Sequence, residues 1–186
     1  MLKRLCALLI LLLVCSCASA EQTVTLSPYQ SSDAEIAYAA LLGLDEPHLV
    51  YAFAADTPGT IRLNVYTWQE NTWQMSNRQC IPYMGSSGRF ALACEALEKQ
   101  LRIALQCGRQ STELICHPLF GQAASELTDT QVSLSETAEI PFGQEIPLVL
   151  QSSGGAELTL DDYNRPSAIS GPAYAITIVF EKGDVP

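Results

Sequence analysis

Short segments in which apolar residues occupy alternate positions run through most of the chain after residue 48. The clearest is TIRLNVYTW (60–68), whose alternation is typical of a strand with one buried face. Similar segments are HLVYAFAAD (48–56), TWQMSNRQCI (72–81), GRFALAC (88–94), LRIALQC (101–107), ELICHPLF (113–120), EIPLVLQ (145–151), AELTL (156–160) and AYAITIVFE (173–181). We predict a strand at each of them.

Turn-forming residues separate these segments. Asp56-Thr57-Pro58-Gly59 precedes the second strand, and Glu70-Asn71 joins the two strands of the clearest hairpin. Ser152-Ser153-Gly154-Gly155 lies between EIPLVLQ and AELTL and predicts a second hairpin. Many short strands at close intervals predict a mainly β fold, either an antiparallel β-sandwich or a partly open barrel.

One short N-terminal helix is the exception to the β pattern. Ser32-Asp33-Ala34-Glu35 has the S-x-x-E form of a capping box, and Gly43 is well placed to end the helix. The polar residues 21–32 before it predict a tether or a first edge strand. We therefore expect residues 33–186 to form a single β-rich domain.

The first twenty residues have the features of an export signal. Lys3 and Arg4 precede a Leu-rich segment that is too short to span a bilayer, as in a signal peptide. Ala18-Ser19-Ala20 predicts cleavage after Ala20 and a free secreted protein. Val14-Cys15-Ser16-Cys17 resembles a bacterial lipobox and instead predicts a lipid anchor on Cys17. Both cleavages remain open, and both place the protein outside the cytoplasm.

The net charge of the mature chain limits the classes of molecule that it can bind. Removing Lys3 and Arg4 leaves eight basic residues against twenty acidic ones, a net charge of −12 for the mature chain. Such acidity repels phosphate backbones and anionic lipids, so we expect no nucleic-acid partner. No later apolar segment is long enough to cross a bilayer, which limits the expected membrane contact to the lipid anchor.

Four cysteines remain after the leader: Cys80, Cys94, Cys107 and Cys116. Their spacing lacks the short Cys-x2-Cys form of zinc sites. An even number in an oxidising compartment favours disulfide bonds, with three possible connectivities. Pairing neighbours, Cys80 with Cys94 and Cys107 with Cys116, would close two short loops. The alternative is that all four are reduced.

Aromatic residues on the first hairpin form the most notable candidate site. With a two-residue loop, Trp68 lies opposite Trp73 and shares its face with Tyr66 and Met75. A loop one residue longer would turn Trp73 to the core and Trp68 away from it. Tyr66, Trp68 and Trp73 either pack within the protein or form a platform on which a sugar ring could stack.

The sequence supports no catalytic residue, cofactor or metal site. His48 and His117 are the two histidines, and no G-x-S-x-G motif is present. We therefore expect a cell-envelope β-sandwich that binds a cell-surface protein or glycan without catalysis. Two alternatives are an exported carboxylate-dependent hydrolase acting on glycans, and an assembly subunit that donates its C-terminal strand to a neighbouring sheet.

Overall fold

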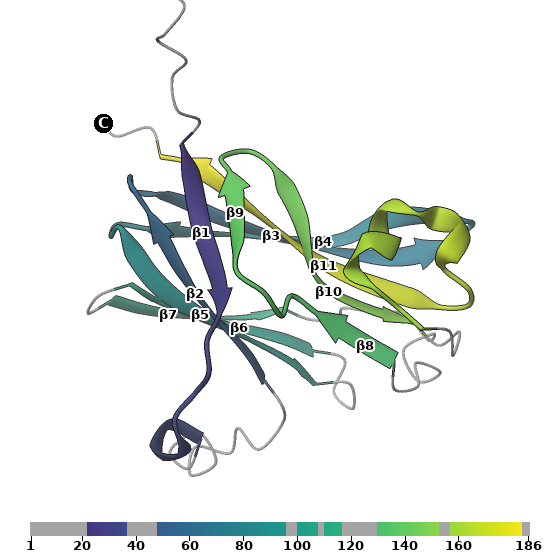
Figure 1. The fold of residues 1–186 in the computed structure, drawn as a ribbon, viewed down its shortest axis with the longest axis horizontal. Helices are drawn as coiled ribbons and strands as arrows, with labels where there is room; N and C mark the ends of the chain where they lie inside the picture. Colours follow the sequence, from purple (N-terminus) through teal and green to yellow (C-terminus); the bar gives the residue numbers. More distant parts are fainter. Residues whose placement is uncertain are drawn as a thin grey trace, which may run out of the picture.

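The computed structural model describes residues 22–36, 48–95, 100–107, 110–116, 130–152 and 157–183. Their strands form two antiparallel sheets that pack as a β-sandwich (Figure 1), which confirms the predicted fold class. The strands are β1 (Thr23–Pro28), β2 (His48–Ala55), β3 (Gly59–Gln69), β4 (Thr72–Tyr83), β5 (Ser87–Glu95), β6 (Gln100–Cys107), β7 (Gln110–Cys116), β8 (Thr130–Ser133), β9 (Ala138–Pro141), β10 (Glu145–Ser152) and β11 (Ala173–Lys182). The six-stranded sheet has the order β7-β6-β5-β2-β1-β9, and the five-stranded sheet the order β4-β3-β11-β10-β8.

The main core lies between the two sheets and follows from the alternation seen in the sequence. Tyr51 and Phe53 of β2 face Phe180 of β11 across this core, and the ring centroids of Phe53 and Phe180 are 5.6 Å apart. On β3, Ile61, Leu63 and Val65 point into the same core, each with 1% of its surface exposed. Burial of these apolar side chains is the principal favourable contribution to folding.

Strand β11 is the centre of the five-stranded sheet. It pairs with β3 along one edge and with β10 along the other. All eight residues from Ala173 to Phe180 are buried. One face meets the main core; on the other face Ala173 and Ala175 belong to a second apolar cluster, and Thr177 lies among polar side chains. The predicted last strand is therefore confirmed, and it completes the protein's own sheet.

Residues 23–28 form an interior strand, and the prediction of a tether or edge strand there was wrong. Strand β1 pairs with β2 on one side and β9 on the other, and Val24 and Leu26 are fully buried. Only two of its six residues carry large aliphatic side chains, so the short alternation was obscured by its polar neighbours. The domain consequently includes β1 and starts ahead of residue 33.

The second predicted hairpin is also wrong. Residues 157–159 are not in a strand, and the 3-10 helix η2 (Leu160–Asn164) follows them, with η3 (Pro166–Ala168) beyond. Strand β10 pairs instead with β11 and with β8, a strand that the sequence pattern did not identify. Thr159 and Asp162 form a capping box, and this local bonding favours a helical turn over an extended strand.

The predicted N-terminal capping box is confirmed. Ser32 N–H donates to Glu35 Oε2 at 2.9 Å, and Glu35 N–H donates to Ser32 Oγ at 3.3 Å, at the start of helical residues 33–36. The remainder of the predicted helix, including Gly43, lies outside the described residues. None of the helices in the described ranges is long and apolar enough to cross a membrane.

The two disulfide bonds predicted between neighbouring cysteines, Cys80–Cys94 and Cys107–Cys116, do not fit this fold. Cys80 is a free, exposed thiol on β4, whereas Cys94 belongs to β5 of the other sheet. Cys116 lies opposite Leu101, and Cys107 lies opposite Gln110 at the other end of the β6–β7 pair. Cys107 is thus six residues along β6 from Leu101, the partner of Cys116. Six residues of strand span roughly 20 Å, which is far beyond the reach of a disulfide bond. Neighbouring cysteines in sequence are thus separated by the topology.

The side chains of Cys94, Cys107 and Cys116, like the whole of Cys17 and Ala20, lie outside the described part of the chain.

Candidate functional site

The face of the five-stranded sheet that points away from the main core, called here the outer face, carries an aromatic cluster at one end. The cluster consists of Tyr66, Trp68, Trp73 and Tyr163. Glu70 and Asn71 have positive φ angles of 51° and 60°, so they form a two-residue hairpin turn that places Trp68 opposite Trp73. The two indole rings meet edge to face, with centroids 5.0 Å apart and planes inclined by 64°.

A segment from the other end of the chain covers this cluster. The Tyr163 ring, carried by η2, stacks on Trp73 with a centroid separation of 5.5 Å and lies 5.9 Å from the Tyr66 ring. Trp73 Nε1 also donates a hydrogen bond of 3.0 Å to the Tyr163 carbonyl oxygen. Figure 1 shows the helical turns of this segment lying over the β3–β4 end of the sheet. Apolar residues beneath them include Leu150, Ile169 and Ala175.

Next to the aromatic cluster, the outer face carries a polar cluster formed by Asn64, Tyr66, Arg78, Glu145 and Thr177. Glu145 Oε1 accepts hydrogen bonds from Asn64 Nδ2 and the Tyr66 hydroxyl, both at 2.9 Å, and a third bond from the Thr177 hydroxyl. Asn64 Oδ1 accepts a bond of 3.0 Å from Arg78 Nε. Asn64 and Thr177 have no exposed surface, so the hydrogen bond between them is buried, whereas their bonds to Glu145 and Arg78 are partly buried.

Register explains how the sequence assembles this cluster. Asn64 lies opposite Thr177 on one side and Arg78 on the other, which aligns β4, β3 and β11 in one row. A register shift after Val65 makes Ser76 an extra residue in β4, and its hydroxyl donates to the Val65 carbonyl oxygen. This bulge keeps Met75 and Arg78 on the same side of the strand although they are three residues apart.

The hydrogen bonds and charges alter the titration of these groups. Partial burial raises the pKa of Glu145, but the bonds from Thr177, Asn64 and Tyr66 outweigh burial and hold that pKa below its usual range. Burial raises the pKa of the Tyr163 hydroxyl, and the negative charge of Glu145 adds to the effect. Burial, the hydrogen bond to Glu145 and the charge of Glu145 raise the pKa of Tyr66 as well. At neutral pH Glu145 is therefore ionised, and the phenols of Tyr66 and Tyr163 are neutral.

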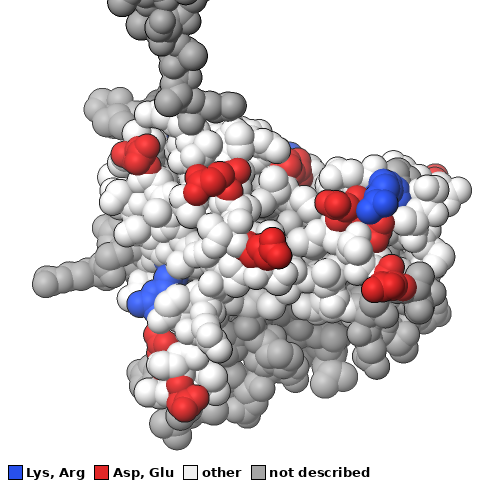
Figure 2. All heavy atoms as spheres, in the orientation of Figure 1, with Lys and Arg blue, Asp and Glu red and all other residues white. Residues whose placement is uncertain are grey.

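Charged side chains continue the polar surface beyond the cluster. Arg62 and Glu181 form an ion pair over the buried Val179, which lies opposite Arg62 in the register. Elsewhere the surface is acidic: the view in Figure 2 shows carboxylates spread across the molecule and few basic groups. The whole chain has a net charge of −10.

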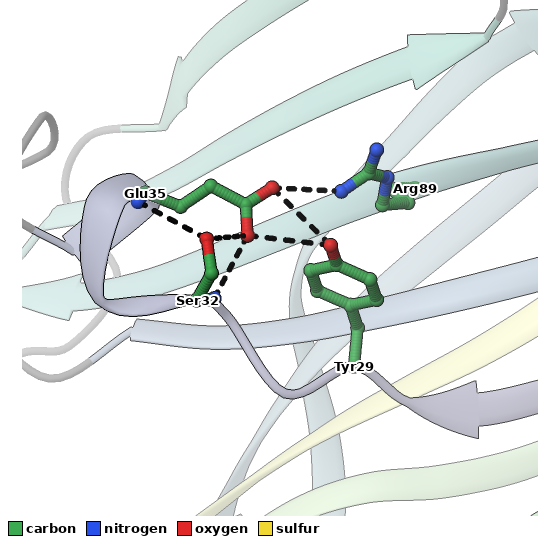
Figure 3. Close-up of polar contacts among 4 residues, drawn as sticks. All are labelled: Tyr29, Ser32, Glu35 and Arg89. Carbon is green, nitrogen blue, oxygen red and sulfur yellow. Dashed lines mark hydrogen bonds and ion pairs between the residues drawn. The ribbon is translucent and has the colours of Figure 1, made fainter.

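A second polar cluster lies on the six-stranded sheet and holds the N-terminal helical turn in place (Figure 3). Arg89 NH1 donates to Glu35 Oε1 at 3.0 Å, and its guanidinium lies 4.5 Å from the centre of the Tyr29 ring. The Tyr29 hydroxyl donates to the same carboxylate. Bonds from Ser32, aided by Tyr29 and Arg89, lower the pKa of Glu35 to about 2. A shallow pocket of about 300 Å³ lies beside Arg89 and Gln106.

The sequence identified part of this arrangement. Tyr66, Trp68 and Trp73 do share one face, as the two-residue loop predicts, but their rings are mutually inclined and Tyr163 occupies one side of Trp73. A continuous flat platform is therefore not formed. His48 begins β2, opposite Ala93. The polar cluster escaped sequence reasoning because Glu145 and Thr177 are distant from Asn64 along the chain. The one available signal was a polar Asn64 within the strongly alternating β3.

In the described ranges, no group of three or more His, Cys, Asp or Glu side chains is arranged to hold a metal ion. Comparison of the chain with models of protein families, with curated proteins and with solved structures gave no match.

Proposed function

We propose that this protein is an exported, non-catalytic binding module of the cell envelope, which contacts a cell-surface protein or glycan through the outer face of its five-stranded sheet. The leader supports export, and Cys17 would supply a lipid anchor if cleavage occurs before it. Cleavage after Ala20 would release the same module into the medium.

The observation that carries this proposal is the double role of Tyr66. Its ring belongs to the aromatic cluster, and its hydroxyl donates to Glu145 in the polar cluster. The outer face thereby presents apolar rings and fixed hydrogen-bonding groups side by side. Binding sites in proteins commonly combine apolar contact area with a few precisely placed polar groups.

The pKa of Glu145 favours binding over glycan hydrolysis at this site. A carboxylate-dependent hydrolase needs a general acid whose pKa is raised, so that it stays protonated near neutral pH. The hydrogen bonds to Glu145 lower its pKa instead. The assembly-subunit alternative gains no support either, because β11 is already paired along both edges.

Retention on isolated cell envelopes tests the proposal. Met75 is 44% exposed on β4 beside Tyr66, so Met75→Arg should block the outer face and reduce retention by about tenfold or more. Ala54→Arg, at an exposed position on the opposite sheet, is the matched control and should bind like the wild type. Equal binding by both variants would exclude this face as the interface, and absence of wild-type retention would refute the function.

The leader requires its own measurement. The intact mass of the protein from membrane and medium fractions distinguishes a diacylglyceryl-modified chain starting at Cys17 from a free chain starting at Glu21. A cytoplasmic protein that keeps its first twenty residues would contradict export and with it the envelope function.

A further inference from the structure

Glu145 and Arg78, the two charged residues of the polar cluster, have hydrogen-bonding atoms that the cluster does not use. All three hydrogen bonds to Glu145 end on Oε1, and Oε2 accepts none from the described residues. Arg78 donates from Nε to Asn64, while its two terminal nitrogens make no hydrogen bond within the described ranges. Both residues are exposed, so among the described residues one carboxylate oxygen and two guanidinium nitrogens are available to a ligand.

Asn64 fixes these two groups relative to each other. Its amide oxygen accepts from Arg78 and its amide nitrogen donates to Glu145, so the planar amide joins the guanidinium to the carboxylate. Thr177 holds the same Asn64 nitrogen from the next strand at 3.4 Å. Because Asn64 and Thr177 are fully buried on rigid strands, the charged groups are oriented before any ligand arrives. Such preorganisation reduces the entropic cost of binding.

The polar cluster has an apolar wall on one side. Tyr66 and Met75 lie opposite each other in the next row of the sheet, and the Tyr163 ring extends this wall. A ligand for this surface must therefore accept one hydrogen bond and donate another, and must also offer an apolar side to the rings.

We propose that this surface is a subsite for a glycan, in which Arg78 and Glu145 bind two adjacent hydroxyl groups of one sugar ring. One hydroxyl accepts from the Arg78 guanidinium, the other donates to Glu145 Oε2, and the C–H side of the ring packs against Tyr66 and Met75. Arg78 and Glu145 determine specificity, and Asn64 positions them. This inference rests on the proposed binding function and specifies its ligand.

Charge supports a neutral sugar over an ionic ligand. An anion that pairs with Arg78 would also meet Glu145 and the field of a chain with a net charge of −10. A cation attracted by Glu145 would meet Arg78 in the same way. Paired hydroxyls satisfy both groups without leaving an unmatched charge.

The test uses isolated envelopes of the native host in three forms: untreated, oxidised with periodate and then washed, and digested with protease. Periodate cleaves the bond between adjacent hydroxyl-bearing carbons and so removes the proposed ligand. We expect it to reduce retention of the full-length mature protein by tenfold or more, whereas protease should leave retention unchanged.

Variants connect the effect to the named residues. Arg78→Lys keeps the charge but loses the guanidinium fork, and Glu145→Gln keeps the shape but loses the charge; each should lower retention about tenfold. The matched controls are Arg89→Lys and Glu139→Gln. Arg89 lies on the other sheet, and Glu139 likewise accepts hydrogen bonds from two neighbouring hydroxyl groups, Thr23 and Thr25. Both controls should bind like the wild type.

The possible failures are distinct. Retention lost after protease but not after periodate would identify a protein partner; it would overturn the glycan subsite and leave the binding function intact. Retention that survives both treatments would show a ligand without adjacent hydroxyls and would also overturn it. If Arg78→Lys and Glu145→Gln are folded by circular dichroism and are fully retained, then Arg78 and Glu145 do not bind the ligand, and the assignment of these residues to the subsite is wrong. No retention of the wild type on untreated envelopes would refute the binding function itself.

Discussion

Tyr163 and Trp73 contact each other twice, although they lie 90 residues apart in the chain: their rings stack with centroids 5.5 Å apart, and the indole N–H donates to the Tyr163 carbonyl oxygen. The stack attaches the η2 segment to the β3–β4 hairpin. It also means that the aromatic cluster is closed on one side by the protein's own ring.

Removing the Tyr163 ring should weaken this attachment. We expect Tyr163→Ala to lower the free energy of unfolding by about 2 kcal/mol, from lost ring contacts and lost apolar burial. Tyr163→Phe keeps the ring and should cost less than about 1 kcal/mol. Urea denaturation followed by tryptophan fluorescence measures both. Equal losses for the two variants would show that the hydroxyl, rather than the stack, provides the stability.

Asn64 should be more sensitive than its small side chain suggests. Asn64→Ala removes the amide that accepts from Arg78 and donates to Glu145 and Thr177. Because two of these hydrogen bonds involve charged groups, we predict a loss of about 1–3 kcal/mol in the free energy of unfolding, measured by urea denaturation. Asn77→Ala, a half-buried asparagine on β4, is the control and should lose less. A smaller loss at Asn64 than at Asn77 would contradict the structural role of the polar cluster.

Position 59 requires glycine because the neighbouring atoms leave no space for a side chain. A Cβ atom there would lie 2.1 Å from the Glu181 carbonyl oxygen and 2.8 Å from the Tyr83 hydroxyl. We expect Gly59→Ala to lower the unfolding free energy by about 3 kcal/mol, because the backbone of β11 would have to move. At Gly85 the nearest atom would be 3.5 Å away, an ordinary contact, so Gly85→Ala should be nearly neutral. Thermal denaturation of the pair compares them, and equal melting temperatures would contradict the close approach of β3 to β11.

Acidification should reveal the bonds to Glu145. Its pKa is lower in the folded protein than the ordinary 4.5, so the folded state favours the ionised form, and this stability is present above pH 4.5. It should decrease as the pH falls below 4.5 through the lowered pKa. Glu145→Gln lacks this titration, so the stability difference between wild type and variant should shrink on acidification. Urea denaturation from pH 7 to pH 3 measures it, and a difference that grows at low pH would reverse the sign of the pKa shift.

Cys80 should react without denaturation. Its thiol is free and exposed on the outer face of β4, so iodoacetamide should label it in the folded protein. Peptide mass spectrometry locates the label. If iodoacetamide labels Cys80 only after the protein has been reduced, then Cys80 forms a disulfide bond and the prediction is wrong.

The sequence was sufficient for most of the fold because strands with one buried face have a visible period. HLVYAFAAD, TIRLNVYTW and AYAITIVFE correspond to β2, β3 and β11, with ends that differ by at most one residue. The two-residue turn at Glu70-Asn71 places Trp68 opposite Trp73 on the same face of the sheet, so their shared face was predictable too.

Prediction failed where the decisive contacts are distant in the chain. AELTL has the alternation of a strand, yet the Thr159–Asp162 capping box and the contacts of Tyr163 with Trp73 hold the following residues as a helical turn. Strand β1 has a weak pattern and is stabilised by pairing with β2 and β9. For the same reason Glu145, 81 residues after Asn64, was not associated with it. Local patterns do not contain strand order, and strand order decides which side chains meet.

The position of β11 has a consequence for the timing of folding. This strand follows the other described strands in sequence, but it lies between β3 and β10 in the five-stranded sheet. Until residues 173–182 are available, β3 can pair only with β4 and β10 only with β8. A ribosome releases the chain from its N-terminus onward, and pairings of such large sequence separation form slowly. The pairs β3–β4 and β8–β10 therefore stay separate until β11 joins them into one sheet.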